Sequence, residues 1–135
     1  MVKAKLLIDT KEVNVLWYKV GFNQTTDRTG RPSQQPIFKG LQVVIESQKD
    51  IDLADWSFAA DQTKQLELHI YPVLMGGKTR KIYFYDCHLV DWKTHFSASG
   101  SKKPMSESLQ ISAGGLKDSN SMVEYSNYWR ETYQN

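Results

Sequence analysis

Two long strand-like runs, separated by a polar segment, constrain the fold more than any other feature of this sequence. Because side chains alternate along a strand, each run presents one apolar face. In the first run, VNVLWYKVGFNQ (13–24), the residues on this face are Leu16, Tyr18, Val20 and Phe22. In the second run, IFKGLQVVIES (37–47), they are Ile37, Leu41, Val43 and Ile45. The chain is therefore predicted to contain two long strands, each with one apolar face.

The segment between these strands, TTDRTGRPSQQP (25–36), is twelve residues long, has almost no large apolar side chain, and is called the arm below. A connection of this length without regular structure is usually functional or disordered. Arg28 and Arg31 could simply be solvated residues of a polar loop, with no further role. Two arginines beside an aspartate and a Gly-Arg-Pro turn also suit docking, because a guanidinium group makes directional contacts. We therefore expect the arm to dock on another molecule.

The composition fits one ordinary globular domain. The chain has 135 residues, of which 40% are hydrophobic and 24% charged, so it can bury a core and implies neither disorder nor a fibrous repeat. The formal net charge is only +2, which produces no strong field for nucleic acid or anionic lipid. Cys87 is the single cysteine, so the fold must hold without an internal disulfide.

The N-terminal sequence, MVKAKLLIDT, has only a short apolar run, Leu6-Leu7-Ile8. That run is far too short for the core of a signal peptide or for a membrane-spanning helix. We therefore expect a protein that begins in the cytoplasm and does not insert directly into a membrane. If it leaves the cell, it leaves without a cleaved signal peptide.

Four further runs predict strands. Lys3–Asp9 precedes the first long run and forms a hairpin with it. Lys64–Val73 and Met105–Ala113 alternate well between apolar and polar residues. Thr79–Phe96 is rich in aromatic and β-branched residues, but its alternation slips part of the way along. A β-bulge near residues 85–87 would reconcile its two halves.

One short helix is predicted between the second long strand and Lys64, with Asp50 or Asp52 as its N-cap. We expect it to plug one open end or face of a curled sheet with Trp56 and Phe58. The elements together predict a mainly β fold, a curled antiparallel β-barrel or a two-sheet sandwich with one short α-helix.

We expect residues 1–114 to form this barrel and residues 115–135 to form a C-terminal tail. The tail carries apolar and aromatic side chains at spacings that fit a short amphipathic helix, or a segment docked on the barrel or on a neighbour. These side chains are Met122, Tyr125, Tyr128, Trp129 and Tyr133.

Catalytic and cofactor motifs are missing from the sequence. Cys87 and His88 suggest a thiol–imidazole pair, but consecutive residues of a strand point to opposite faces. The three histidines are scattered, and there is no HExxH, no paired CxxC and no glycine-rich phosphate loop with a lysine. We therefore expect no enzyme activity, no metal and no cofactor.

The alternative function is that of a small β-barrel that binds a ligand or single-stranded nucleic acid. Aromatic side chains on strands can stack on unpaired bases, and the candidates are Tyr83, Phe84, Tyr85 and Trp92. Aromatic residues are also common in sheets for packing reasons alone. The nearly neutral net charge disfavours a nucleic-acid partner.

Several motifs in the same order resemble the tube protein of type VI secretion systems, the Hcp (TssD) family, and in particular its Bacteroidota branch. They are KAKLLIDTKEVNVL, TDRTGRPS, LQVVIES, a short helix with DW, and YFYDCHLVDWKTHFSASGSKKPMSESLQISA. The resemblance extends from about Lys3 to Ala113. The sequence departs from the family at KQLELHIYPVLMGGKTRK and after Gly114.

The resemblance implies a tail-tube-like barrel that forms hexameric rings, which stack into a hollow tube. It implies as partners further copies of the chain, a contractile sheath, a spike protein and effectors carried in the lumen, with secretion through the type VI apparatus. A phage-type or other contractile-injection tube is a variant of the same interpretation. The resemblance also places a loop of the arm at subunit and ring contacts. Its residues are Thr25, Thr26, Asp27, Arg28, Thr29, Gly30, Arg31, Pro32 and Ser33.

Overall fold

The computed structural model describes residues 3–23, 26–31, 37–48, 51–59, 61–72, 77–96, 105–120, 124–127 and 129–132. Within these residues the chain forms strands and one helix. In chain order they are β1 (Lys3–Ile8), β2 (Lys11–Asn23), β3 (Ile37–Glu46), α1 (Leu53–Phe58), β4 (Lys64–Tyr71), β5 (Arg80–Phe96), β6 (Met105–Ser112), β7 (Gly115–Asp118) and β8 (Tyr125–Ser126).

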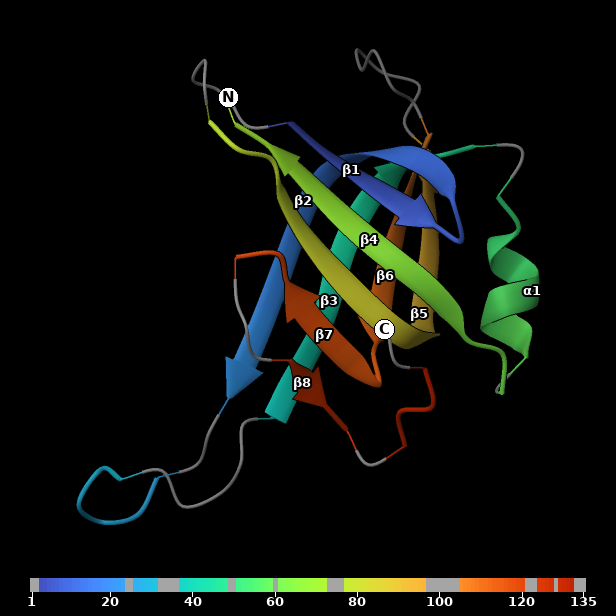
Figure 1. Ribbon diagram of the computed structural model, residues 1–135. Helices are drawn as coiled ribbons and strands as arrows, with labels where there is room; N and C mark the ends of the chain where they lie inside the picture. Colours follow the sequence, from blue (N-terminus) through green and yellow to red (C-terminus); the bar gives the residue numbers. More distant parts are fainter. Residues whose placement is uncertain are drawn as a thin grey trace.

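Six of the strands close into an antiparallel barrel (Figure 1). The strand order is β4-β1-β2-β3-β6-β5, and β4 also pairs with β5, so the ring of strands is complete. β7 pairs with β5 and carries β8, and the two short strands extend the sheet beyond the barrel. The predicted mainly β fold with a curled barrel and one short helix is confirmed.

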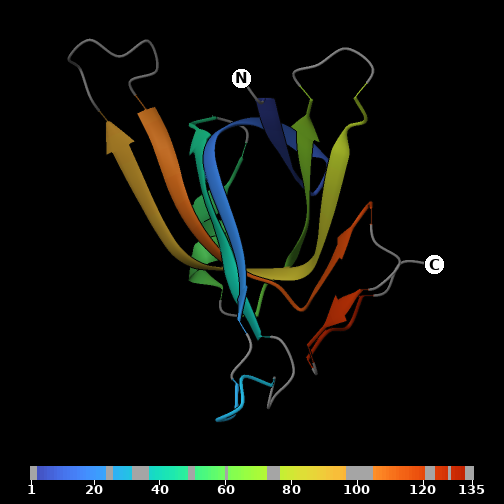
Figure 2. The ribbon, with the colours of Figure 1, turned by 90° about the vertical axis from the view of Figure 1, so that its left-hand side faces the viewer.

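Strand β5 makes this closure possible because it bends. In Figure 2 it runs down one side of the barrel, crosses the base and rises on the other side. Its first half pairs with β4 and β7, and its second half pairs with β6. At the bend, two residues of β5, Tyr85 and Asp86, lie opposite the single residue Gln65 of β4, and Asp86 has φ +53°. This is the predicted β-bulge, which is confirmed.

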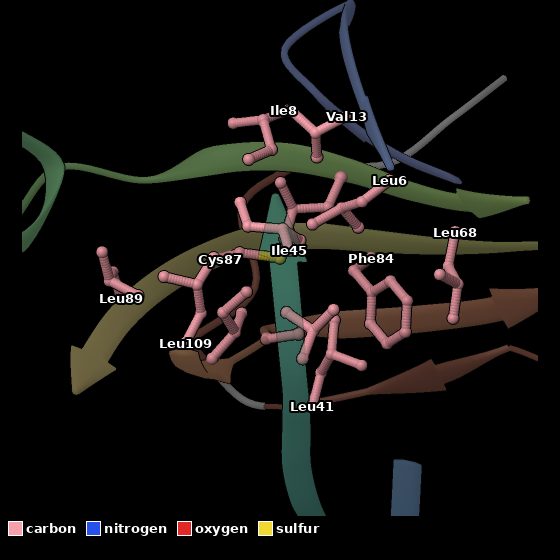
Figure 3. Packing of buried hydrophobic residues seen from close by; sticks show 14 of the residues in the cluster. Leu6, Ile8, Val13, Leu41, Ile45, Leu68, Phe84, Cys87, Leu89 and Leu109 are labelled. Atoms are coloured by element: carbon pink, nitrogen blue, oxygen red, sulfur yellow. The ribbon is translucent and has the colours of Figure 1, made fainter. Parts of the chain in front are cut away.

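The bulge inserts one extra residue into β5, so residues of opposite parity before and after it point to the same face, as the slip in alternation predicted. Ile82 and Phe84 point into the barrel before it, and Cys87 and Leu89 point into the barrel after it. Figure 3 shows Phe84, Cys87 and Leu89 packed among leucine and isoleucine side chains from the other strands. The closed sheet therefore buries one continuous apolar core.

The hairpin predicted at the N-terminus is confirmed. β1 and β2 pair antiparallel and are joined by Asp9 and Thr10, which have φ +48° and +83°. The Asp9 carboxylate accepts a hydrogen bond from the backbone N–H of Gln65 at 2.9 Å. This contact ties the turn to the start of β4.

The apolar faces predicted for β2 and β3 are partly wrong, because each strand contains an irregularity. Leu16 is the extra residue of a register shift between Val15 and Trp17, so it is 44% exposed while Tyr18 and Val20 pack on the core.

In β3 the predicted core residues Leu41, Val43 and Ile45 are buried, but Ile37 is exposed. A second register shift, near Gly40, turns Phe38 inward in its place.

The helix is confirmed, and its N-cap is Asp52, whose carboxylate accepts a hydrogen bond from the Asp55 N–H at 3.1 Å. Trp56 is buried and donates its indole N–H to the Cys87 carbonyl oxygen at 3.1 Å. The expectation that Phe58 also fills the interior is wrong, since Phe58 is 78% exposed. Asp50, the other candidate for the N-cap, lies outside the described residues.

The helix that the tail pattern suggested is not formed in the described residues of the tail. Residues 115–118 and 125–126 are the strands β7 and β8. Gly115 leaves space for this arrangement: a Cβ atom there would lie 2.6 Å from Cδ of Arg130. Close contact between Arg130 of the tail and the start of β7 therefore depends on the absence of a side chain at Gly115.

Gly40 of β3 and Gly21 of β2 face each other, and substitution by alanine is expected to destabilise the protein only at Gly40. Gly40 has φ +110°, and an added Cβ would lie 2.5 Å from the Gln110 amide nitrogen and 3.2 Å from the Ile111 carbonyl oxygen. Gly40→Ala should lower the free energy of unfolding by about 2 kcal/mol or more. Gly21, its partner, has room for a methyl group, so Gly21→Ala should change it by less than about 0.5 kcal/mol. Urea unfolding of the two variants checks this, and equal effects would contradict it.

Candidate functional site

The predicted interface loop lies at the tip of the arm. Thr25, Pro32 and Ser33 lie outside the described residues, whereas Thr26–Arg31 are described and every one of them is exposed. Figures 1 and 2 both show this segment projecting from one end of the barrel, beyond the ends of β2 and β3. The structure therefore brings six of the nine predicted residues together on one exposed projection.

The tip is a turn closed by hydrogen bonds around Asp27. One carboxylate oxygen, Oδ1, accepts from the Thr29 N–H at 2.9 Å, the Thr29 hydroxyl at 2.7 Å and the Arg31 N–H at 3.1 Å. The backbone adds bonds from the Asp27 N–H to the Arg31 carbonyl (2.9 Å) and from the Gly30 N–H to the Asp27 carbonyl (3.1 Å). Gly30 has φ +86°, which glycine adopts without strain.

Electrostatics favour the same turn. Hydrogen bonds from the Thr29 hydroxyl and from the Thr29 and Arg31 N–H groups lower the pKa of Asp27 below its ordinary value. The carboxylate is thus ionised at neutral pH and is held against the turn by these donors. Arg28 and Arg31 are both exposed, so a preformed turn presents two guanidinium groups to solvent.

An aromatic cluster supports the base of the arm. Phe22, the second-last residue of β2, lies 5.3 Å from Phe38 of β3 and 5.4 Å from Tyr125 of β8, between ring centroids. The Phe38 N–H also points to the Tyr125 hydroxyl at 3.5 Å. The tail therefore contacts the point where the arm leaves the barrel.

The tail is held against the barrel at Asp86, the residue at the bend of β5. One carboxylate oxygen, Oδ2, accepts from the N–H groups of Glu131 and Thr132, both at 2.7 Å. The other, Oδ1, accepts from the Gln65 amide at 3.1 Å, and the Asp86 N–H donates back to Gln65 at 3.0 Å. Asp86 is only 5% exposed, so these bonds compensate for the burial of its charge.

Arg130 completes this attachment. Its side chain is buried, and its guanidinium carbon lies 4.3 Å from the ring centroid of Tyr85. It donates to the Glu124 carboxylate at 2.9 Å, the Ser126 hydroxyl at 2.6 Å and the Thr132 carbonyl at 2.7 Å. Sequence reasoning missed this attachment, because Arg130 and Tyr85 lie far apart in the sequence.

The thiol–imidazole pair considered from the sequence does not form. Cys87 is fully buried in the core, and burial raises the pKa of its thiol well above the ordinary value. His88 points to the other face, where its ring lies 5.3 Å from that of Trp129. Within the described residues there is no group of three or more histidine, cysteine or acidic side chains placed to hold a metal ion.

Three of the four strand aromatics considered for base stacking are engaged in packing, whereas Tyr83 is half-buried. Phe84 and Tyr85 are buried, and the Trp92 indole N–H donates to the buried Glu107 carboxylate at 2.7 Å. In the part of the chain that the structure describes, no helix has the length and apolar character to cross a membrane.

Comparisons with known proteins identify one family and several solved structures of similar fold. The sequence model of one family, described as hemolysin coregulated protein Hcp (TssD), matches residues 1–130. The curated protein sequences contain no match. Hcp1 from Flavobacterium johnsoniae has a TM-score of 0.78 at 23% sequence identity, and the match covers 93% of this chain and 99% of that chain.

Two further solved structures are similar. A secreted protein, Hcp3 from Pseudomonas aeruginosa, has a TM-score of 0.60 at 14% identity, covering 97% of this chain and 100% of that one. A type VI secretion system effector from Yersinia pestis has a TM-score of 0.65 at 12% identity, covering 91% and 98%. At these identities the solved structures show a shared fold.

The bonds to Asp86 predict an acid-sensitive tail. Burial opposes its ionisation, but the hydrogen bonds from Thr132, Glu131 and Gln65 outweigh burial, so the pKa of Asp86 lies below its ordinary value of 3.8. A lowered pKa contributes stability that is present above about pH 5 and is lost as the pH falls below 3.8 through the lowered value. Hydrogen exchange of the Glu131 and Thr132 amides, corrected for intrinsic rates, should therefore accelerate only in that acidic range.

Asp86→Asn should expose both amides at neutral pH, with a local loss of about 2 kcal/mol, because hydrogen bonds to a charged acceptor are the strong ones. Asparagine tolerates the positive φ of this position, so the backbone need not change. Asp91→Asn, at an exposed carboxylate on the same strand, is the matched control. Equal exchange in the two variants would show that Asp86 does not hold the tail.

Proposed function

This chain belongs to the Hcp (TssD) family, and we propose that it is a structural subunit of the inner tube of a type VI secretion system. The family membership confirms the resemblance seen in the sequence motifs, and Flavobacterium johnsoniae represents its Bacteroidota branch among the matched structures. In this proposal, six copies form a ring and the rings stack into a tube. A contractile sheath surrounds the tube, a spike protein caps it, and effectors travel in its lumen.

The observation that carries the proposal is the arm. A preformed, exposed turn at the end of two long strands has no packing role in its own barrel, yet Asp27 holds it in one conformation. Rigid projections of this kind reduce the entropy lost on association. We propose that residues Thr25–Ser33 form subunit and ring contacts.

A projecting arm that binds a neighbouring copy can generate a tube through symmetry. A head-to-tail interface that closes after a few copies gives a ring, and a second interface that does not close gives a filament. Polar and charged contacts at the arm supply orientation and specificity, and they keep the free subunit soluble. This function requires no catalytic residue, and we propose none.

Secretion follows from the same role. Hcp3 of Pseudomonas aeruginosa is described as a secreted protein, and the similar Yersinia pestis protein as a type VI secretion system effector. We propose that this chain is made in the cytoplasm and leaves through the type VI apparatus.

Removing the arm cation Arg31 should weaken assembly and leave the barrel intact. Arginines at the centre of an interface often contribute about 2 kcal/mol or more. Arg31→Ala should therefore raise the protein concentration needed for ring formation at least about tenfold, and deletion of residues 29–33 should abolish rings. Sedimentation velocity measures assembly, and circular dichroism checks folding.

Lys93→Ala is the control for this experiment, because Lys93 is an exposed cation on β5, with 75% of its side chain accessible. It should assemble like the wild type. If the arm deletion also forms rings at the wild-type concentration, the arm is not an interface.

A further inference from the structure

A concave site lies on the outer face of the barrel, away from the arm. Its volume is about 530 Å³, and it lies between the β1–β2 turn, β4, the first half of β5 and the end of the tail. Glu67 and Tyr83 are register partners, and they alternate with the core residues Leu66 and Phe84. Their side chains therefore belong to the outer face of the sheet.

The chemistry of this site suits a cation. Asp9 and Glu67 supply carboxylates that are 46% and 38% exposed, and the half-buried Tyr83 supplies an aromatic ring. Carboxylates bind guanidinium groups through charge-assisted hydrogen bonds, and tyrosine rings attract them through their faces. Tyr85 already binds one guanidinium group in this way, that of Arg130.

Both carboxylates keep an exposed surface beside the chain's own basic side chains. Lys64 lies 3.4 Å from Asp9, and His69 lies 3.6 Å from Glu67.

The arm of the same molecule is not placed to fill the site. In Figures 1 and 2 the arm projects from the bottom of the barrel, whereas the β1–β2 turn that borders the site lies in the upper part. The arm carries Arg28 and Arg31 on a turn that is already ordered. Opposite charges on two separate regions of one chain suit a head-to-tail contact between copies.

We propose that the site bordered by Asp9, Glu67 and Tyr83 receives the arginines of the arm from a second copy of this chain. This inference rests on the proposed function, because it names the surface on which the arm docks during assembly. The arm supplies guanidinium groups, and the site supplies two carboxylates and the Tyr83 ring. Each copy donates one arm and offers one site, so the contact can repeat from copy to copy.

Charge reversal on each side tests the contact. One variant carries Arg28→Glu and Arg31→Glu, a second carries Glu67→Arg, and a third combines all three substitutions. Each of the first two variants should raise the concentration needed for assembly at least about tenfold, because like charges then face each other. The combined variant should recover most of the loss, since the opposite charges face each other again.

Asp91→Lys is the matched control, because Asp91 is an exposed carboxylate on β5 that does not border the site. It should assemble like the wild type. Thermal unfolding checks each variant. If Glu67→Arg lowers the melting temperature, Glu67→Gln replaces it, and it should weaken assembly several-fold.

The outcomes separate this inference from the proposed function. If Glu67→Arg or its substitute assembles like the wild type while the arm variant does not, the arm docks elsewhere and the inference is wrong. Failure of the combined variant to recover would also overturn it. If the wild type itself forms no oligomer, the proposed function fails.

Discussion

The bend of β5 is the constraint on which the rest of the structure depends. A flat strand of this length could pair with β6 or with β4, but not close the barrel between them. The bulge at Tyr85–Asp86 turns the strand so that its first half pairs with β4 and its second half with β6. It also reverses the side-chain alternation, so that Phe84 and Cys87 both point into the core. Closure and core formation thus follow from one irregularity.

The same bend organises the tail and, through it, the arm. The bulge places the Asp86 carboxylate where the N–H groups of Glu131 and Thr132 can donate to it. Farther back in the tail, Tyr125 packs against Phe22 and Phe38 at the base of the arm. A continuous set of contacts therefore connects the middle of the barrel to the segment that we propose as an interface. In this account, the tail helps to position the arm.

Much of this fold could be predicted from sequence because its signals are local. Alternation located the strands, the slip in alternation located the β5 bulge, and Asp52 marked the start of α1. The β2 and β3 irregularities were missed because Leu16 and Ile37 continue an apolar pattern through them. The attachment of Arg130 to the barrel was missed for a different reason: it joins Arg130 to Tyr85, more than forty positions away, and local patterns contain no signal for such a contact. The arm was visible as a polar insertion, whereas the concave site combines residues from four separate segments.

The central proposal is that this protein acts as a repeating unit of a tube. Electron microscopy of the purified wild-type protein, with class averages viewed along the particle axis, tests it most directly. The account predicts closed rings with six-fold symmetry that stack at high concentration. Particles that remain single barrels at every concentration would contradict it.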